Sequence, residues 1–406
     1  MVIRDVHVLR KQVPSRRCGS NAFSNRSGSR RSNLTRVDSY DVIVIGGGMA
    51  GVSIGYELAA DRRVLVLDME STLAYHTTGR SAAMFLESYG GPVIRALTTA
   101  SRAFLESAPG DPLLAPLPML HIGRPGHGAA VAQLHREVSS LVPDVELLDP
   151  QEAAGLQPWL RAESVELAVL EPGAMEIDVH GLHQLYVHGL RSRGGIVAVG
   201  ARISSARRRG TAWVVRDAAG TEWQGSVVVD AAGAWADEVA GTFGVAGVGL
   251  RALRRSAFMV DGPSSAGGPM VADIDDTFYV KPDRGRMLCS PSDETPQQPG
   301  DARPDTTEIA RAIQVINEAT TLNVRHVRSA WAGLRSFVAD RSPVVGYDHT
   351  ADGFFWFAAQ GGYGIQTAPA LARTGAALLR GEQLPHDVAA RGLTPAAVAP
   401  DRAQLR

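Results

Sequence analysis

The chain has 406 residues, of which 45% are hydrophobic and 20% are charged, and its formal net charge is −1 at pH 7. This length suffices for a large hydrophobic core and for two domains. The near-zero charge excludes a general attraction to nucleic acid or to anionic membranes, and no uninterrupted apolar run is long enough to span a bilayer.

Residues 1–38 differ in composition from the rest of the chain. Arginines are frequent here and stand among Ser, Asn and Gly, with few acids and little apolar periodicity. This composition is typical of a disordered leader, of a segment translated from a wrongly chosen upstream start codon, or of a targeting peptide, although the apolar stretch of a secretory signal is missing. We expect the fold to begin near Ser39.

The chain next shows the pattern of a dinucleotide-binding unit. A short β-branched run at residues 42–45 predicts a strand buried on both faces, and Gly46, Gly48 and Gly51 follow it in GxGxxG spacing. The first glycine allows a tight turn, the second lets a pyrophosphate approach the backbone, and the third lets the next helix close onto the strand. A helix predicted over 49–60 would turn its free amides and positive end toward that pyrophosphate.

An acidic residue ends the second strand of this unit. The apolar run at 64–67 predicts that strand, and Asp68 follows it about 20 residues after the glycines. A carboxylate at this place accepts hydrogen bonds from ribose hydroxyls. A glycine-rich turn without a ligand is the alternative, and the order of strand, turn, helix, strand and acid argues against it.

The following segments alternate between helical and irregular patterns. Apolar residues at helical spacing predict a helix over 92–107, whereas the Pro- and Leu-rich stretch at 109–120 predicts an irregular wall. A second helix is expected over 178–193, with an acidic cap at its start and two glycines after its end, and a strand follows at 196–199. Parallel α/β structure therefore resumes there.

The second half of the chain predicts a meander, an inserted domain and a return to the first domain. Short strands between 202 and 225 lead into a strand at 227–230, which ends in Ala-Ala-Gly-Ala-Trp and allows a second close approach to a cofactor. Separated strands between 245 and 329 indicate an inserted domain. From Phe354 onward the sequence predicts a buried strand, a second glycine turn and a long helix.

Four histidines could have a chemical role, but each also has a simpler structural explanation. His180 and His183 have the i, i+3 spacing of metal ligands, but no third ligand is evident, so we predict no metal site and assign them packing or solvent roles. His121 and His127 flank a Gly-rich stretch, and we expect both to be exposed.

The two cysteines, Cys18 and Cys289, fit a reducing environment. They are too few for a disulfide framework or a cysteine-based metal site. Cys289 has no acid or histidine nearby in the sequence, so we expect a buried, unreactive thiol. We therefore expect a cytoplasmic protein, either free or peripheral to the membrane.

Two glycine turns at opposite ends of the chain, with the Ala-Ala-Gly-Ala-Trp strand between them, resemble the FAD-dependent D-amino-acid oxidase and dehydrogenase superfamily. Five further motifs resemble those of bacterial D-arginine dehydrogenases: residues 76–83 (HTTGRSAA), 254–258 (RRSAF), 278–282 (FYVKP), 331–340 (WAGLRSFVAD) and 359–367 (AQGGYGIQT). The resemblance covers essentially everything after the leader. It implies an α/β fold in which a Rossmann-like FAD-binding domain carries an inserted substrate domain with a mixed or antiparallel sheet.

The resemblance and the pattern of elements together give expected domain boundaries. The FAD-binding domain would comprise residues 39–90, 175–245 and 330–390. The substrate domain would comprise residues 91–174 and 246–329.

The resemblance implies a non-covalent FAD whose isoalloxazine ring rests on residues 76–83. The expected cofactor-binding residues come from that segment, the two glycine turns, the acid after the second strand and the strand between them. They are Gly46, Gly48, Met49, Ala50, Gly51, Asp68, His76, Thr78, Gly79, Arg80, Ser81, Ala82, Ala83, Gly233, Trp235, Gly333, Gly361, Gly362, Tyr363, Gly364 and Ile365.

The resemblance also implies a clamp for a substrate carboxylate, made by Arg255 and Arg335. Guanidinium groups suit this task because their planar forks hold both carboxylate oxygens. Ordinary ion pairs are the alternative interpretation for both arginines.

Four further residues are implied to orient the substrate around its α-carbon. The hydroxyls of Tyr89 and Tyr279 would donate near the carboxylate or the amino group, and the carbonyl of Gly333 and the side chain of Gln366 would help place the amine. Fixing three substituents of the α-carbon leaves one face for the flavin, which selects one enantiomer.

Two departures from D-arginine dehydrogenases concern the substrate side chain. Met84 stands where those enzymes have a histidine after the GRSAA run, and Met119 aligns with the carboxylate that pairs with the substrate guanidinium. Thioethers fill apolar space, and burying an unpaired guanidinium is costly, so basic substrates are disfavoured. Glu87 is a candidate replacement acid for the pocket, and both methionines could instead be plain core residues.

The resulting hypothesis is an enzyme that oxidises the CH–NH2 group of an apolar or uncharged D-amino acid by hydride transfer to FAD. The imino acid would hydrolyse to a 2-oxo acid and ammonia, as in amino-acid catabolism. Alternatives are an oxidase of secondary amines such as sarcosine or proline, a 2-hydroxy-acid dehydrogenase, and a flavin-binding partner protein without turnover. The sequence leaves open whether electrons pass to oxygen, a quinone or another acceptor.

Overall fold

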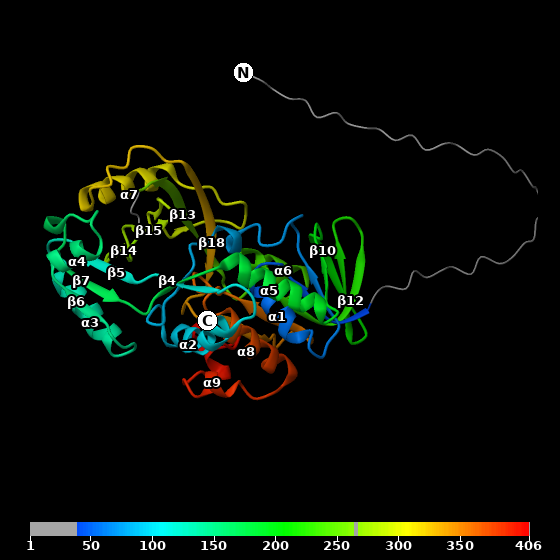
Figure 1. Ribbon diagram of the computed structural model, residues 1–406. Helices are drawn as coiled ribbons and strands as arrows, with labels where there is room; N and C mark the ends of the chain where they lie inside the picture. The colour runs from blue at the N-terminus through cyan, green and yellow to red at the C-terminus, as the bar shows by residue number, and fades with distance from the viewer. Residues whose placement is uncertain (1–38, 264–266, 406) are drawn as a thin grey trace, which may run out of the picture. The chain divides into compact units, whose positions relative to one another are not determined.

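The computed structural model describes residues 39–263 and 267–405 of the chain (Figure 1). The predicted leader and Cys18 lie outside these residues. The described part contains two large sheets and one small sheet, and helices cover the large sheets.

The first large sheet has eight strands and a parallel centre. Its order is β10-β11-β12-β1-β2-β9, with β20 next to β12 and β19 next to β20, and β10, β11 and β19 pair antiparallel. The strands are β1 (Ser39–Ile45), β2 (Val64–Leu67), β9 (Ile196–Ala198), β10 (Ile203–Arg209), β11 (Ala212–Asp217), β12 (Glu222–Asp230), β19 (Val344–Tyr347) and β20 (Phe354–Ala358).

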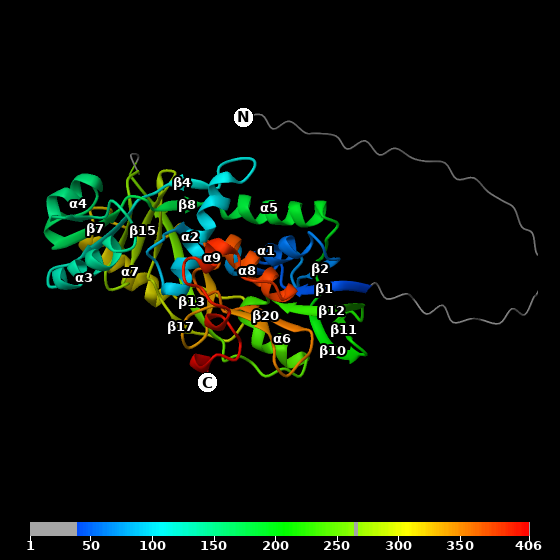
Figure 2. The same ribbon diagram turned by 90° about the horizontal axis from the view of Figure 1, so that it is seen from below.

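Strand β1 shows why this sheet is buried on both faces. Val42 and Val44 point into one core cluster and Ile43 and Ile45 into another, as the period of two in a strand requires. Burial of each such side chain contributes about 2 kcal/mol. Figure 2 shows α1, α5 and α8 on one side of β1, β12 and β20, and α6 on the other side. The helices are α1 (Met49–Leu58), α2 (Pro92–Ser107), α5 (Val179–Ser192), α6 (Ala236–Thr242), α8 (Ala368–Arg380) and α9 (His386–Ala389).

The second large sheet has nine strands in mixed orientation. Its order is β17-β13-β16-β15-β14-β5-β7-β6, and β18 pairs with β13; β14 and β5 are parallel and the other pairs are antiparallel. The strands are β5 (Met119–Gly123), β6 (Glu146–Leu148), β7 (Leu167–Glu171), β13 (Arg251–Asp261), β14 (Met270–Asp273), β15 (Tyr279–Asp283), β16 (Arg286–Ser290), β17 (Thr295–Pro296) and β18 (Ser329–Phe337).

Helices α3 (Gly128–Ser139), α4 (Pro150–Leu156) and α7 (Thr306–Ala319) lie around this sheet (Figure 1). The side chains of Ile309 and Ile316 on α7 belong to the core cluster that contains Phe258 and Val280 of the sheet. The small sheet has the order β3-β8-β4, with β3 (Met84–Phe85), β4 (Leu114–Pro116) and β8 (Met175–Ile177). Short 3-10 turns are η1 (Thr77–Arg80), η2 (Ala162–Ser164), η3 (Gly233–Trp235), η4 (Pro395–Ala397) and η5 (Ala403–Leu405).

Most predicted elements are confirmed, one prediction is wrong, and one helix was not predicted. The stretch at 109–120 is not an irregular wall, because it contains β4 and the start of β5. Strand β4 has three residues and ends in Pro116, which hid it. The region between 245 and 329 contains the helix α7, whose N-cap Asp305 accepts hydrogen bonds from the amides of Thr307 and Glu308.

Two elements connect the regions that the predicted domain boundaries separate. Helix α2 packs against α8, and its Leu97 and Ala100 belong to the core cluster of the first sheet. Strand β18 pairs along nine residues with β13 of the second sheet. The boundaries themselves stay a prediction. None of the helices in residues 39–263 and 267–405 is long and apolar enough to cross a membrane.

Gly51→Ala should prevent the β1–α1 turn from closing. A Cβ atom at Gly51 would lie 1.8 Å from the carbonyl oxygen of Gly46, which is a backbone atom that cannot move aside cheaply. We expect destabilisation by about 3 kcal/mol or more and loss of bound flavin. Thermal unfolding and the flavin content of the purified protein measure both effects.

Gly241→Ala is the matched control, because Gly241 also lies in a helix and a Cβ there meets nothing within 4 Å. We expect this variant to be as stable as the wild type or slightly more so. Normal flavin content in Gly51→Ala would contradict the close packing of this turn.

Candidate functional site

A cavity of about 440 Å³ lies between residues of the two large sheets. On one side, Ile45, Leu67, Ala231 and Ala358 line it, and each is at or next to the carboxyl end of a parallel strand of the first sheet. Ligands of open α/β sheets bind at this edge. The position of the cavity therefore agrees with a bound dinucleotide.

The glycine turn after β1 brings the backbone close to this edge. Gly46 has a φ of +112°, and a Cβ atom there would lie 2.4 Å from the carbonyl oxygen of Ala231. Asp68 accepts hydrogen bonds from the amides of Gly47 (2.6 Å) and Glu70 (2.8 Å). Because each carboxylate oxygen has two acceptor sites, Asp68 keeps capacity for ribose hydroxyls.

The segment after β2 is fastened to the strand that carries Arg335. In η1, the hydroxyl of Thr77 donates to the carbonyl of Leu334 (2.8 Å) and the guanidinium of Arg80 donates to that of Ala332 (2.9 Å). The GRSAA run and β18 are thereby held side by side along the cavity. The hydroxyl of Thr78 accepts from the amide of Met49 at the start of α1 (3.0 Å), which ties the same segment to the glycine turn.

The polar atoms of the cavity fit a flavin dinucleotide. His76 Nδ1, Ser336 Oγ and Gln360 Nε2 are buried without a hydrogen-bond partner among the described residues, and all three residues line the cavity. Buried polar atoms are normally paired, so these atoms indicate a ligand with several acceptors and donors. Gly46, Gly47 and Gly48 line the cavity directly before the start of α1, where dinucleotide-binding turns hold a pyrophosphate.

One face of the second sheet forms the opposite wall of the cavity. In one row, Leu120, Val271, Val280, Cys289 and Phe258 are neighbours across five strands, and all of them are core residues. In the next row His121, Ala272 and Tyr279 are neighbours, and all three line the cavity. The period of two along each strand thus separates a packed core face from a cavity face.

Two arginines project from neighbouring strands into the cavity. Arg255 on β13 is paired with Gly333 on β18, and Arg335 lies two residues further along β18. Side chains in this diagonal relation are within reach of each other. Both side chains are largely buried, with 14% and 19% of their surface exposed. Burial, and then the like charge of Arg335, lower the pKa of Arg255.

Glu294 partly compensates the two positive charges. Its Oε1 lies 3.4 Å from Nη2 of Arg255, 3.9 Å from Nη1 of Arg335 and 2.9 Å from Nη2 of Arg341. Burial alone would raise the pKa of Glu294, but hydrogen bonding and charge from Arg341, with the charges of the other two arginines, lower it. One carboxylate therefore serves three guanidinium groups, so Arg255 and Arg335 keep hydrogen-bond donors for a further anion.

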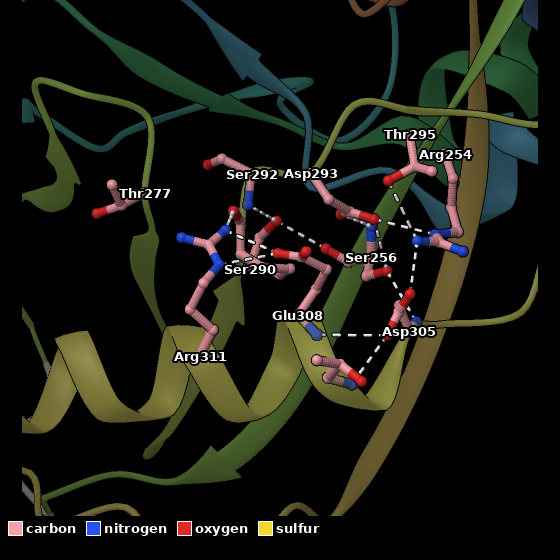
Figure 3. A network of polar contacts seen from close by, with 12 residues as sticks. Arg254, Ser256, Thr277, Ser290, Ser292, Asp293, Thr295, Asp305, Glu308 and Arg311 are labelled. Carbon is pink, nitrogen blue, oxygen red and sulfur yellow. Dashed lines mark hydrogen bonds and ion pairs between the residues drawn. The ribbon is translucent and has the colours of Figure 1, made fainter.

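A polar network behind the clamp fixes the strand that carries Arg255 (Figure 3). The buried Asp293 carboxylate accepts from the amide (2.6 Å) and hydroxyl (3.0 Å) of Ser256 and from Nε of Arg254 (3.1 Å). Arg254 also pairs with Asp305 at the start of α7 (2.9 Å). The backbone carbonyl of Asp293 accepts from Nε of Arg255 (3.0 Å), so this network directly orients the cavity arginine.

The other predicted orienting residues also line the cavity. Tyr89 and Tyr279 line the same cavity as Arg335. The amide of Gln366 is engaged at both ends: Oε1 accepts from the amide of Leu86 (3.3 Å) and Nε2 donates to Thr98 (2.9 Å). In this structure Gln366 therefore holds the cavity wall in place.

The substrate side of the cavity is rich in methionine. Met84 and Met119 line it as predicted, together with Met270 and Leu86. Glu87 is not brought there: its carboxylate pairs with the guanidinium of Arg102 on α2, and it is absent from the described lining of the cavity. The suggestion that Glu87 is a pocket acid is therefore wrong, because the neighbouring arginine draws it away.

The cavity collects nearly all predicted cofactor residues. Three of them lie outside its described lining: Gly51 and Gly79 serve backbone packing, and Tyr363 packs against the rings of Tyr89 and Phe337. The lining residues are Gly46, Gly48, Met49, Ala50, Asp68, His76, Thr78, Arg80, Ser81, Ala82, Ala83, Gly233, Trp235, Gly333, Gly361, Gly362, Gly364 and Ile365.

Sequence analysis missed several lining residues, and His121 and Asp276 are the most relevant. His121 was expected to be exposed and instead faces the cavity from β5, where burial lowers its pKa to about 4. Asp276 lines the cavity with a φ of +54°, and burial raises its pKa against the opposing charges of Arg255 and Arg335. The alternation Met119-Leu120-His121 could have indicated that His121 shares a face with Met119.

Other chemically interesting residues have structural roles. His183 is buried, and its Nε2 lies 3.0 Å from the carbonyl oxygen of Gly47, so it supports the glycine turn. Cys289 is buried on the core face, as predicted, and burial raises its pKa; its lack of reactivity stays a prediction. His127 pairs with Asp275 (2.8 Å) and is partly exposed. Within the described residues, no group of three or more His, Cys, Asp and Glu side chains could hold a metal ion.

Comparisons with known proteins agree with this geometry. FAD-dependent oxidoreductase domain-containing protein 1 from Bos taurus is 25% identical over 391 residues, which span 82% of this chain and 79% of that protein. Glycine oxidase from Geobacillus kaustophilus (strain HTA426) is 23% identical over 379 residues, which span 87% of this chain and 97% of that protein.

Solved structures show the same fold. A crystal structure of glycine oxidase from Geobacillus kaustophilus matches with a TM-score of 0.75 at 22% identity and covers 88% of this chain and 99% of that one. A crystal structure of L-proline dehydrogenase from P. horikoshii also matches with a TM-score of 0.75, at 18% identity, and covers 86% of this chain and 96% of that one.

The likeness extends to a family model. The fold is the α/β fold of these oxidoreductases, with an FAD-binding domain and a mixed-sheet substrate domain. The model described as FAD dependent oxidoreductase matches residues 41–378. The chain belongs to this family of FAD-dependent oxidoreductases.

Proposed function

We propose that the protein oxidises the CH–NH2 group of a D-amino acid with an apolar or uncharged side chain. The proposal rests on one observation: Arg255 and Arg335 line the same cavity as the segments that are expected to bind the flavin. Two buried guanidinium forks with one shared counter-ion favour an anionic ligand. An amino-acid carboxylate meets this requirement with two oxygens.

The walls around the clamp favour an uncharged side chain on that amino acid. Met84, Met119 and Met270 give the pocket flexible apolar surface. Glu87 is occupied by Arg102, so it offers no counter-ion to a substrate guanidinium. Burying a cation against thioethers without a partner is costly, which argues against D-arginine and D-lysine.

The residues of the chain would orient the substrate and exclude water. Arg255 and Arg335 hold the carboxylate, and Tyr89 and Tyr279 donate hydrogen bonds near it. The carbonyl of Gly333, which is directly opposite Arg255 in the sheet, is the expected partner of the amine. A bound flavin supplies the two-electron chemistry by accepting a hydride from the α-carbon. Loss of the hydride and of an amine proton gives an imino acid, which water hydrolyses to a 2-oxo acid and ammonia.

We propose that the FAD is bound non-covalently. Cys289, the cysteine in the described part of the chain, is buried on the core face of the second sheet and does not line the cavity. His76 lines the cavity, with Nε2 2.9 Å from a carboxylate oxygen of Glu70. The buried Nδ1 of His76 is suited to a hydrogen bond with the cofactor.

The names of the relatives favour amine oxidation over hydroxy-acid oxidation. Glycine oxidase and L-proline dehydrogenase are named for substrates with a carboxylate and an amine on one carbon. A secondary amine such as sarcosine or proline is therefore the second candidate substrate. The two names do not indicate one enantiomer, so the preference for the D form rests on the resemblance of the five sequence motifs.

Anaerobic mixing with a panel of amino acids should bleach the flavin absorbance of the loaded enzyme. We expect bleaching by apolar or uncharged D-amino acids and little by D-arginine, L-amino acids or N-methyl amino acids. The flavin spectrum is the readout. Bleaching only by secondary amines or by 2-hydroxy acids would replace the proposed substrate class, and no bleaching by any of them would contradict enzymatic turnover.

Arg335→Met should lower kcat/KM at least about 100-fold while flavin stays bound, because it removes one buried fork of the clamp. Arg328→Met is the matched control, since Arg328 is exposed and pairs with Asp261 outside the cavity. Steady-state kinetics measure kcat/KM of both variants, and their flavin content is the second readout. Unchanged turnover in Arg335→Met would refute the clamp.

Glu294→Gln should strengthen carboxylate binding about three- to tenfold, because the substrate would no longer compete with the Glu294 charge for the two arginines. We expect KM to fall with little change in kcat. Glu222→Gln, which removes a carboxylate from an exposed pair with Arg207, should leave KM unchanged. A higher KM in Glu294→Gln would show that Glu294 holds the arginines in place.

Acid precipitation should release all flavin into the supernatant, because the proposed binding involves no covalent bond. The absorbance of supernatant and pellet measures the distribution. Flavin that stays with the washed pellet would show covalent attachment and would point to His76, whose ring lines the cavity.

A further inference from the structure

A histidine lies at the end of the cavity that is far from the clamp. His121 is on β5, and the strands β14, β15 and β16 separate β5 from β13, which carries Arg255. Since neighbouring strands are about 4.8 Å apart, the backbones of β5 and β13 are roughly 19 Å apart. The cavity therefore extends well beyond the α-carbon of a substrate whose carboxylate lies at the clamp.

The surroundings of His121 are apolar. His121 lies opposite Ala272 on β14 and Val169 on β7, and Met119, two residues earlier, lies opposite Met270 and Glu171. The Glu171 carboxylate is buried and accepts a hydrogen bond from the hydroxyl of Ser88 (2.6 Å). Met119 and Met270 share one hydrophobic cluster with Leu86. A side chain that reaches this end of the cavity thus meets apolar atoms on most sides and one imidazole.

The imidazole is free to bind a ligand. Among the described residues, no side chain or backbone group makes a hydrogen bond to the ring of His121, and burial keeps it neutral near neutral pH, with a pKa of about 4. A neutral imidazole has one N–H donor and one nitrogen acceptor. His121 is only half-buried, and neither ring nitrogen is among the buried unpartnered atoms of the described residues, so both are open to the cavity and to a ligand group placed there.

We propose that His121 determines specificity by hydrogen bonding to an uncharged polar group at the end of the substrate side chain. The substrate is then an amino acid whose apolar stem or ring ends in a hydroxyl, amide or ring N–H group. This inference rests on the proposed function for the orientation of the substrate, with its carboxylate at Arg255 and Arg335. A charged terminal group is disfavoured, because the lining here consists of methionines and a neutral ring, and the nearby carboxylate of Glu171 is bound by Ser88 and lies outside the described lining.

Two ligands that differ in a single hydroxyl group test this inference without turnover. They are 3-phenylpropanoate and 3-(4-hydroxyphenyl)propanoate, titrated into the flavin-loaded enzyme with the flavin spectrum and calorimetry as readouts. We expect the hydroxylated ligand to bind about tenfold more tightly to the wild type. His121→Leu should abolish this preference, and His121→Gln, which keeps a donor and an acceptor, should retain most of it.

Two controls separate this inference from the proposed function. His127→Leu changes a partly exposed histidine of the same region and should keep the wild-type ratio of affinities. Arg335→Met should weaken both ligands equally; if it weakens neither, the clamp is refuted, while the ratio still reports on His121. If His121→Leu fails to bind flavin, His121→Phe, which lacks hydrogen-bonding atoms, takes its place. Equal affinities in the wild type, or a preference that survives removal of the imidazole, would overturn the inference.

Discussion

The largely buried guanidinium groups of Arg255 and Arg335 line one cavity. The second sheet must therefore place groups of opposite charge or dipole beside them. Burial, and then the like charge of Arg335, lower the pKa of Arg255, so both guanidinium groups need partners of opposite charge. Glu294 supplies a carboxylate, and the backbone carbonyl of Asp293 supplies a dipole. Because Glu294 is shared with Arg341, it does not occupy all the hydrogen-bond donors of Arg255 and Arg335. A substrate carboxylate is the group that would complete this balance.

The need to hold Arg255 in place also explains why a polar network lies next to its strand. Asp293 fixes Ser256 and Arg254, and Arg254 reaches the helix start at Asp305, so polar groups hold β13 from its core side (Figure 3). The alternation along the strands leaves the other face for the cavity. In the proposed function, recognition of the substrate carboxylate and side chain therefore depends on one face of the second sheet, while the first sheet would position the cofactor.

The sequence predicted the first sheet better than the second. The β1–α1–β2 unit follows from local pattern, because strand, glycines and acid lie within one short segment. Helix α7 had a readable signal in Asp305 and the spacing of Ile309 and Ile316. The pairing of Arg102 with Glu87 could not be predicted, because it depends on how the turn after β3 packs against α2. Alternation along β5 could place His121 beside Met119, but only the pairing of β5 with β14 brings that face to the cavity. Resemblance of five motifs indicated Arg255 and Arg335 as the proposed clamp, and the pairing of β13 with β18 explains why these two residues meet.

A crystal structure of the flavin-loaded protein with 3-phenylpropanoate is the most direct test of the carboxylate clamp. Our account predicts that the ligand carboxylate lies within hydrogen-bond distance of the guanidinium groups of Arg255 and Arg335, with Glu294 paired to Arg341 and the phenyl ring among Met84, Met119 and Met270. A carboxylate bound elsewhere, with both arginines still directed at Glu294, would contradict it.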